Sequence, residues 1–130
     1  MNSIPFEVPD EHGVILLLAV IDHKFTFRLA LDTAATHTTL DSNMLFLAGY
    51  ELKNSTGEAQ IETANGAIRV ELYEVQHLEC AGLQHSNFSV QVYDFLAHGI
   101  TTEYDGVVGL DFFRNHKFCV DLRTGELTLV

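Results

Sequence analysis

Apolar and polar residues alternate with a period of two over most of this chain, and this alternation strongly constrains the fold. The clearest example runs from Phe25 to Leu31, where every second residue is large and apolar, and the pattern recurs at 68–72 and 88–92. Because successive side chains of a strand point to opposite faces, these segments are expected to be half-buried strands. The pattern therefore predicts an all-β fold rather than a βαβ arrangement.

Short turn sequences separate the expected strands. Asn65-Gly66 is a strong hairpin signal, because both residues tolerate a positive φ. The expected turns, each with its flanking or enclosing strand segments, are Asp22-His23-Lys24 (14–21 and 25–31), Asn65-Gly66 (within 61–72), Ala81-Gly82 (69–80 and 87–94) and Thr124-Gly125 (118–122 and 126–130).

Two short helices are expected between the strands. One runs over about Asn43–Ala48, with Asp41 or Ser42 as N-cap and Gly49 just past its end. The other runs over about Asp111–Asn115. An all-β domain with two helical turns is closer to a barrel or folded sheet than to any parallel α/β fold.

Length and charge limit the classes of function. The chain has 130 residues, the size of one domain spanning 1–130, and 7 Lys and Arg against 18 Asp and Glu give a net charge of −11. Such an acidic surface argues against binding to nucleic acid or to anionic membranes. The longest apolar run, 14–21, is too short for membrane insertion, and residues 1–13 lack the basic start of a secretory signal. A soluble, cytoplasmic protein is expected.

Cysteine and histidine usage predicts neither a metal nor a cofactor. Cys80 and Cys119 lie in separate apolar, strand-like stretches, so two buried, reduced thiols are expected. The seven His form no HExxH motif and no i, i+4 pair. The chain also lacks the glycine-rich loops that bind phosphate and the G-x-S-x-G motif of serine hydrolases.

One acidic residue stands in an unusual place. The apolar strand 27–31 runs directly into Asp32, which is followed only by small and hydroxyl-bearing residues through Thr36. Burying a carboxylate at the end of a core strand is costly. Two interpretations remain open from the local pattern: Asp32 caps a turn by accepting backbone N–H groups, or it is a catalytic carboxylate.

Four features in order resemble the retropepsin-like aspartic proteases. The stretch Asp32–Ala35 resembles that family's signature, which is Asp, then Ser or Thr, then Gly, then Ala, Ser or Thr. Asn65-Gly66 resembles the tip of its flap hairpin. Gly106–Gly109 resembles the motif of two hydrophobic residues and a glycine that precedes the C-terminal helix, here Leu110–Asn115. The closing hairpin 118–130 is similar to the end of pepsin-type lobes and of the retropepsin-like domains of ubiquitin-shuttle proteins. The resemblance covers residues 14–130.

The resemblance implies a single-lobe retropepsin-like fold and aspartic endopeptidase activity. In that chemistry two nearby carboxylates share one proton, the ionised one activates a water and the protonated one polarises the scissile carbonyl. This chain has one Asp-Thr motif. The second carboxylate must then come from another copy, so the resemblance implies a C2 homodimer in which two Asp32 residues meet.

Roles for individual residues follow from the resemblance. Asp32 is the catalytic carboxylate, and Thr33 hydrogen-bonds across the two-fold axis to hold the pair. Val107 and Val108 also support the Asp32 loop. The residues expected to contact the peptide substrate are Ala34, Thr36, His37, Asn65, Gly66, Val107 and Val108.

Position 34 departs from the family pattern, because Ala34 stands where the family has glycine. A methyl group there is tolerated if φ is negative, but it crowds the groove beside Asp32; a positive φ would add strain. Three functions therefore stay open. They are an endopeptidase of extended peptides, a weak or inactive module for dimerisation or peptide binding, and a small-ligand barrel in which Asp32 is an incidental turn residue.

Overall fold

The computed structural model describes residues 2–64 and 66–130, and strands dominate it. In chain order the elements are β1 (Asn2–Pro5), β2 (Leu16–Ile21), β3 (Phe25–Leu31), β4 (Thr39–Asp41), α1 (Ser42–Leu47), η1 (Leu52–Asn54), β5 (Ser55–Thr63), β6 (Gly66–Cys80), β7 (Leu83–Tyr93), η2 (Leu96–His98), β8 (Gly106–Val108), η3 (Leu110–Phe113), β9 (Phe118–Asp121) and β10 (Glu126–Leu129). The all-β fold class expected from the alternation is confirmed.

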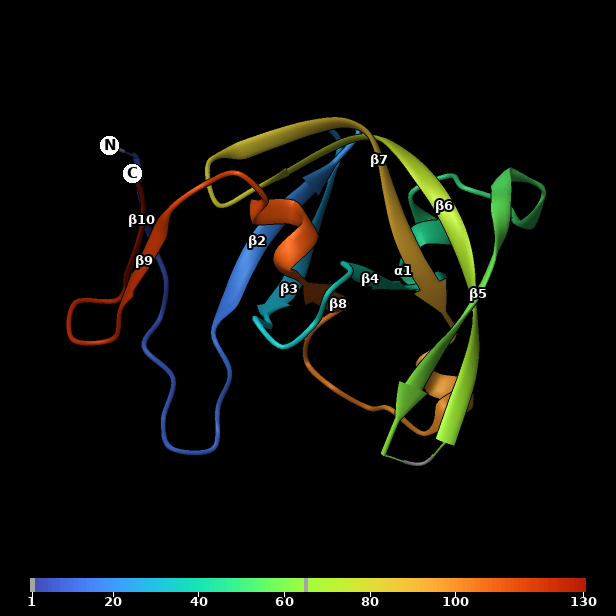
Figure 1. Ribbon diagram of the computed structural model, residues 1–130, viewed down its shortest axis with the longest axis horizontal. Coiled ribbons are helices and arrows are strands. Elements are labelled where there is room, and N and C mark those ends of the chain that lie inside the picture. Colours follow the sequence, from blue (N-terminus) through green and yellow to red (C-terminus); the bar gives the residue numbers. More distant parts are fainter. Residues whose placement is uncertain (1, 65) are drawn as a thin grey trace.

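The larger sheet closes on itself. Its strands follow the order β2-β3-β8-β4-β7-β6-β5, and β2 also pairs with β6, so six of the seven strands form a closed barrel. Strand β5 pairs with β6 alone and is left as an edge strand. In Figure 1 the β5–β6 hairpin extends beyond the barrel toward the lower right. We call the outer part of this hairpin, residues 59–68, the flap.

A smaller sheet joins the two ends of the described chain. Strands β1 and β9 flank β10 in antiparallel pairs, with Ser3 opposite Thr128 and Thr128 opposite Cys119. Figure 1 shows this sheet at one side of the barrel, with the N and C labels side by side. Strand β1 was not expected from the sequence, because Asn2–Pro5 shows no alternation of apolar and polar residues.

The strand pattern places the core as expected. In β3, Phe27 and Leu29 are buried while Thr26 and Arg28 are exposed. The turn before β3 is also as expected: Asp22 and His23 have φ of 54° and 61°, and the Lys24 N–H donates to the Ile21 carbonyl over 3.0 Å. Two successive positive φ values are the mark of the tight turn that suits the twist of paired strands. The largest fully buried side chains are Tyr73, Phe112, Ile21, Leu29, Leu40, Leu45, Leu78 and Leu127.

Both expected helical segments are present, but only the first is an α-helix. Helix α1 has the predicted position, with the Asp41 carboxylate as N-cap accepting from the Asn43 N–H and with Gly49 at φ 99° after its end. The expected helix at 111–115 is instead the 3₁₀ turn η3, Leu110–Phe113. The 3₁₀ turns η1 and η2 were not expected. No helix among the described residues is long and apolar enough to cross a membrane.

The two cysteines have different environments, which corrects one expectation. Both thiols are free, as expected, but only Cys80 is buried, whereas Cys119 is exposed. The period-two pattern misleads at β9, where Cys119 and Val120 are both exposed. Burial raises the pKa of the Cys80 thiol to about 12. Because the thiolate is the reactive form, Cys80 is expected to be inert in the folded protein.

This contrast predicts thiol reactivity. With a disulfide reagent at pH 8, one thiol per native chain should react quickly, and the second only after denaturation. A Cys119→Ser variant should lose the fast phase and keep the slow one, whereas Cys80→Ser should do the reverse. Two fast thiols per native chain would contradict the burial of Cys80.

Candidate active site

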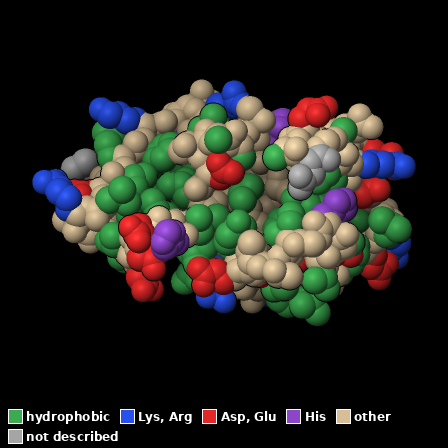
Figure 2. Space-filling model, turned by 90° about the horizontal axis from the view of Figure 1, so that it is seen from below, with side chains coloured by type: hydrophobic (Ala, Val, Ile, Leu, Met, Phe, Trp, Pro, Cys, Tyr) green, Lys and Arg blue, Asp and Glu red, His purple; other side chains and the backbone are tan. Residues whose placement is uncertain are grey.

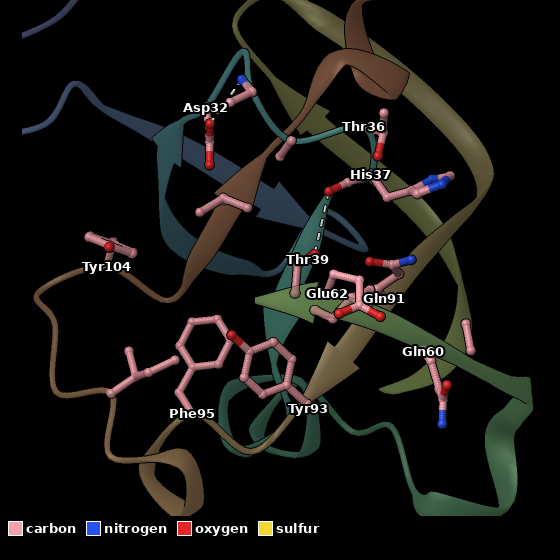
Figure 3. Close-up of a pocket in the computed structure, with 16 residues that line it drawn as sticks. Asp32, Thr36, His37, Thr39, Gln60, Glu62, Gln91, Tyr93, Phe95 and Tyr104 are labelled. Carbon is pink, nitrogen blue, oxygen red and sulfur yellow. Dashed lines mark hydrogen bonds between the residues drawn. The ribbon is translucent and has the colours of Figure 1, made fainter. Parts of the chain in front are cut away.

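A cleft of about 720 Å³ lies between the barrel and the flap. Its lining comes from the loop after β3, residues 59–62 of β5, the end of β7 and the segment leading to β8. Figure 3 shows Asp32 at one end of this cleft, with Thr36 and His37 beside it and Tyr93 and Phe95 on the opposite wall. Figure 2, which views the molecule from the side of the flap tip, shows apolar and uncharged side chains over the middle of this face.

Asp32 is held by its own loop and by a neighbouring strand. Its backbone N–H donates to the Val108 carbonyl over 3.1 Å, so the parallel pairing of β3 with β8 fixes the point where the loop begins. One carboxylate oxygen, Oδ1, accepts from the Ala34 N–H at 3.0 Å. Asp32 therefore caps a turn and lines the cleft at once. Turn capping, the first of the two interpretations of this residue, is confirmed by this hydrogen bond.

A second carboxylate holds the far end of the same loop, residues 32–38, which we call the Asp32 loop. The Asp111 carboxylate accepts from the Thr38 N–H at 2.9 and 3.0 Å and from the Thr38 hydroxyl at 2.8 Å. The Thr38 hydroxyl oxygen in turn accepts from the Gly109 N–H at 3.1 Å. Thr38 is fully buried, so these bonds satisfy polar groups that water does not reach. Nδ1 of His37, an exposed side chain, lies 4.0 Å from the same carboxylate.

Two glycines allow the segments to approach this closely. A Cβ on Gly109 would lie 2.7 Å from the Ala35 carbonyl oxygen, and a Cβ on Gly106 would lie 2.3 Å from the Thr39 carbonyl oxygen. Both clashes are with backbone atoms and cannot be relieved by a side-chain rotation. Glycine is therefore required at both ends of the motif Gly106–Gly109, because the motif packs closely against the Asp32 loop and β4.

The flap is the expected hairpin, but Gly66, which was expected in its turn, is the first residue of β6. Thr63 pairs with Gly66, and Gly66 has a φ of 109°, a conformation that favours glycine. Asn65, the other residue predicted at the flap tip, lies outside the described residues. The flap contributes the stretch 59–62 to the lining of the cleft, and Gly66 is not part of that lining.

The remaining predicted site residues fall into two groups. Ala34, Thr36, His37 and Val107 line the cleft together with Asp32. Thr33 is exposed beside it, and the Val108 side chain is fully buried in the core, while the Val108 carbonyl accepts a hydrogen bond from the Asp32 N–H. Ala34 is not among the non-glycine residues with positive φ, so its methyl group imposes no backbone strain.

Sequence reasoning missed the wall opposite Asp32. Gln91 and Tyr93 line the cleft from β7, and the Tyr93 and Phe95 rings lie 4.8 Å apart between centroids. Burial raises the pKa of Tyr93, and the nearby Tyr104 hydroxyl adds to this shift. The signal was present in the alternation: Val90 and Val92 face the core, so Gln91 and Tyr93, which alternate with them, must face the other way. The remaining lining residues of this wall are Ile100 and Tyr104.

Comparison with known proteins agrees with this geometry. A family-wide sequence profile described as aspartyl protease matches residues 18–112, which includes the Asp32 loop, the flap and the segment through Phe112. The chain belongs to the aspartyl protease family. Membership confirms the resemblance found in the sequence. The reaction class of that family is peptide hydrolysis.

Solved structures place this aspartyl protease family member among retropepsin-like folds. A crystal structure of a retropepsin-like aspartic protease from Rickettsia conorii superposes with a TM-score of 0.71 and 15% sequence identity, covering 98% of this chain and 90% of that chain. The expected single-lobe fold is thereby confirmed. A search of curated proteins found no match.

The Asp111 contacts predict a loss of stability on substitution. Asp111→Ala would leave the buried Thr38 N–H without its acceptor and should lower the free energy of unfolding by about 2–3 kcal/mol. Asp111→Asn keeps one acceptor oxygen and should cost less. Urea unfolding measures both. Asp10→Ala, which removes an exposed carboxylate that accepts one N–H from His12, is the control and should change stability by under about 1 kcal/mol. Equal losses at positions 10 and 111 would contradict the role of Asp111.

Proposed function

We propose that this protein is an aspartic endopeptidase whose catalytic pair consists of Asp32 and Asp32 of a second copy. The observation that carries the proposal is the placement of the Asp32 carboxylate in a peptide-sized cleft, on a loop anchored at both ends by backbone and side-chain hydrogen bonds. An acid that must share a proton needs such a fixed position, because small shifts change the distance between the two charges.

A homodimer supplies what one chain lacks. Asp32 is the only residue of the chain in an Asp-Thr motif, and Glu62 is the only other Asp or Glu side chain among the lining residues of the cleft. Two copies related by a two-fold axis near Thr33 would bring the Asp32 carboxylates together. Thr33 is exposed in the single chain, where it is free to donate a hydrogen bond across such an axis.

The reaction requires water, two carboxylates and no covalent intermediate. At a separation of a few ångströms one carboxylate keeps a proton, because two negative charges repel strongly. The ionised partner takes a proton from a water that attacks the scissile carbonyl, and the protonated partner donates to the carbonyl oxygen. Collapse of the tetrahedral species then passes a proton to the leaving amine. No metal or cofactor is needed for any of these steps.

The free edge of β5 suits an extended substrate. Strand β5 pairs with β6 on one side only, so the backbone groups along its other edge are available. An extended peptide in the cleft can hydrogen-bond to this edge as an added strand. The roles expected for Ala34, Thr36, His37 and Val107 in contacting that peptide fit their position in the lining. Asn65 and Gly66 would then close over the peptide as the flap tip.

One observation favours a second candidate, a catalytically weak or inactive module for dimerisation or peptide binding. The exposed methyl group of Ala34 lines the cleft next to Asp32, where the family has glycine. It narrows the space available to the backbone of a peptide without straining its own. Such a module would bind peptides in the same cleft and leave them uncut.

Replacing the carboxylate separates these candidates. Asp32→Asn should lower kcat/KM on an unstructured peptide substrate at least about 100-fold, because the amide cannot act as a base. Excess Asp32→Asn chain mixed with wild type should also lower wild-type activity, since mixed dimers hold one carboxylate. Excess Asp10→Asn chain is the control. Sedimentation checks that the variant stays folded and dimeric. Full activity in a monomeric fraction would refute the shared pair, and peptide binding without cleavage by wild type would favour the module.

Removing the methyl group tests whether crowding limits the reaction. Ala34→Gly should raise kcat/KM about tenfold, the effect of one methyl group in a tight site. It should also lower the free energy of unfolding by about 0.5–1 kcal/mol through added freedom of the unfolded chain. Ala67→Gly, at an exposed flap position outside the lining, should cause only the second effect. An unchanged kcat/KM in Ala34→Gly would exclude crowding as the limit.

A further inference from the structure

The cleft has an unbalanced charge. Its lining includes the carboxylates of Asp32 and Glu62 and a single imidazole, that of His37. All seven Lys and Arg of the chain are described, and none of them lines the cleft. The chain as a whole carries a net charge of −11. The potential inside the cleft is therefore negative from both local and distant charges, and concave low-dielectric walls strengthen such a potential.

Glu62 is the carboxylate without a structural task. Asp32 accepts a hydrogen bond from its own loop, and Glu58 of β5 pairs with Arg69 outside the cleft. Glu62 is exposed, and no hydrogen bond or ion pair of the described residues engages its carboxylate. Figure 3 draws Glu62 on β5 among the residues that line the cleft, together with Gln91 on β7.

The opposite wall offers the complementary apolar surface. Tyr93 and Phe95 form a tilted aromatic pair on β7 and just after it, and Tyr104 continues the wall from the next segment. Long cationic side chains match a site of this composition, because their methylene chain packs on apolar and aromatic surface while the charged end meets an acid. An acidic side chain would be repelled, and an uncharged one would gain the aromatic contact alone.

We propose that the cleft selects peptides carrying a lysine or arginine, whose charged end is bound by Glu62 and whose methylene chain lies along the aromatic wall of Tyr93, Phe95 and Tyr104. This inference rests on the proposed function for its substrate class. It adds a specificity determinant on the flap. The contact forms when the flap lies over the bound peptide. The charge of the peptide side chain therefore contributes to binding when water is excluded from the cleft.

The test compares side chains of equal length and different charge. Quenched fluorescent peptides differ at one position only, with lysine, norleucine or glutamate, and each position along an eight-residue peptide is scanned in turn. At one position or more the wild type should favour lysine over norleucine in kcat/KM by on the order of fivefold, as expected for a partly exposed ion pair. The ratio should fall as the salt concentration rises from 50 to 500 mM.

Three variants assign the effect to Glu62. In Glu62→Gln the preference for lysine over norleucine should disappear, and in Glu62→Lys glutamate should become the preferred residue. Glu74→Gln, which removes the same charge from an exposed position on β6 outside the lining, should keep the wild-type preference. A preference that persists in Glu62→Gln, or one that disappears equally in Glu74→Gln, would overturn the assignment.

Binding measured without turnover separates this inference from the proposed function. Fluorescence anisotropy of the labelled lysine and norleucine peptides on the Asp32→Asn protein, with and without Glu62→Gln, reports the same preference when no bond is cut. Lysine selection by this protein together with a wild type that cuts no peptide would keep the inference and refute the peptidase. Cleavage by wild type with no dependence on residue 62 would keep the peptidase and refute the inference. Absence of both binding and cleavage would refute both.

Discussion

The carboxylate of Asp111 joins two parts of the chain that are 73 residues apart and on which the cleft depends. It accepts three hydrogen bonds from Thr38 at the end of the Asp32 loop, and it stands at the start of η3. The Asp32 N–H bond to Val108 fixes the other end of that loop. With both ends held, the loop cannot move as a unit relative to the barrel, and the position of the Asp32 carboxylate follows from the barrel itself.

The same contact explains the glycines of the C-terminal motif. Gly106 and Gly109 lie against the backbone of the segment 35–39, closer than a Cβ would allow. The sequence resemblance identified this motif by its letters, and the structure supplies its physical reason. Hydrogen bonds of the Asp111 and Thr38 side chains hold the two segments together. Because Gly106 and Gly109 have no side chain, the two backbones come close enough for those bonds to form.

Much of the fold could be predicted from period-two alternation, because burial on one face imposes it directly. Strands β3, β6 and β7 were found this way, whereas β2 was expected from its continuous apolar run and the turn at Asp22-His23 from its turn residues. Strand β1 and the 3₁₀ turns η1 and η2 were not expected, since their segments show no alternation of apolar and polar residues. The exposed Cys119 was misplaced because β9 belongs to a small sheet that buries little of it. For the cleft, the sequence showed the Asp32 loop but not the wall across from it, because that wall becomes a neighbour of Asp32 only after the barrel closes.

The hydrogen bonds between Asp111 and Thr38 restrict substitution at position 111 more than at position 38. Two of the three come from the backbone N–H of Thr38, a group that every residue except proline possesses. Any other residue with an N–H at position 38 therefore keeps the backbone hydrogen bonds to Asp111, and serine would also keep the hydroxyl. Position 111 has no such latitude, since its contribution lies wholly in the side chain. Position 111 is therefore expected to change more slowly in evolution than position 38.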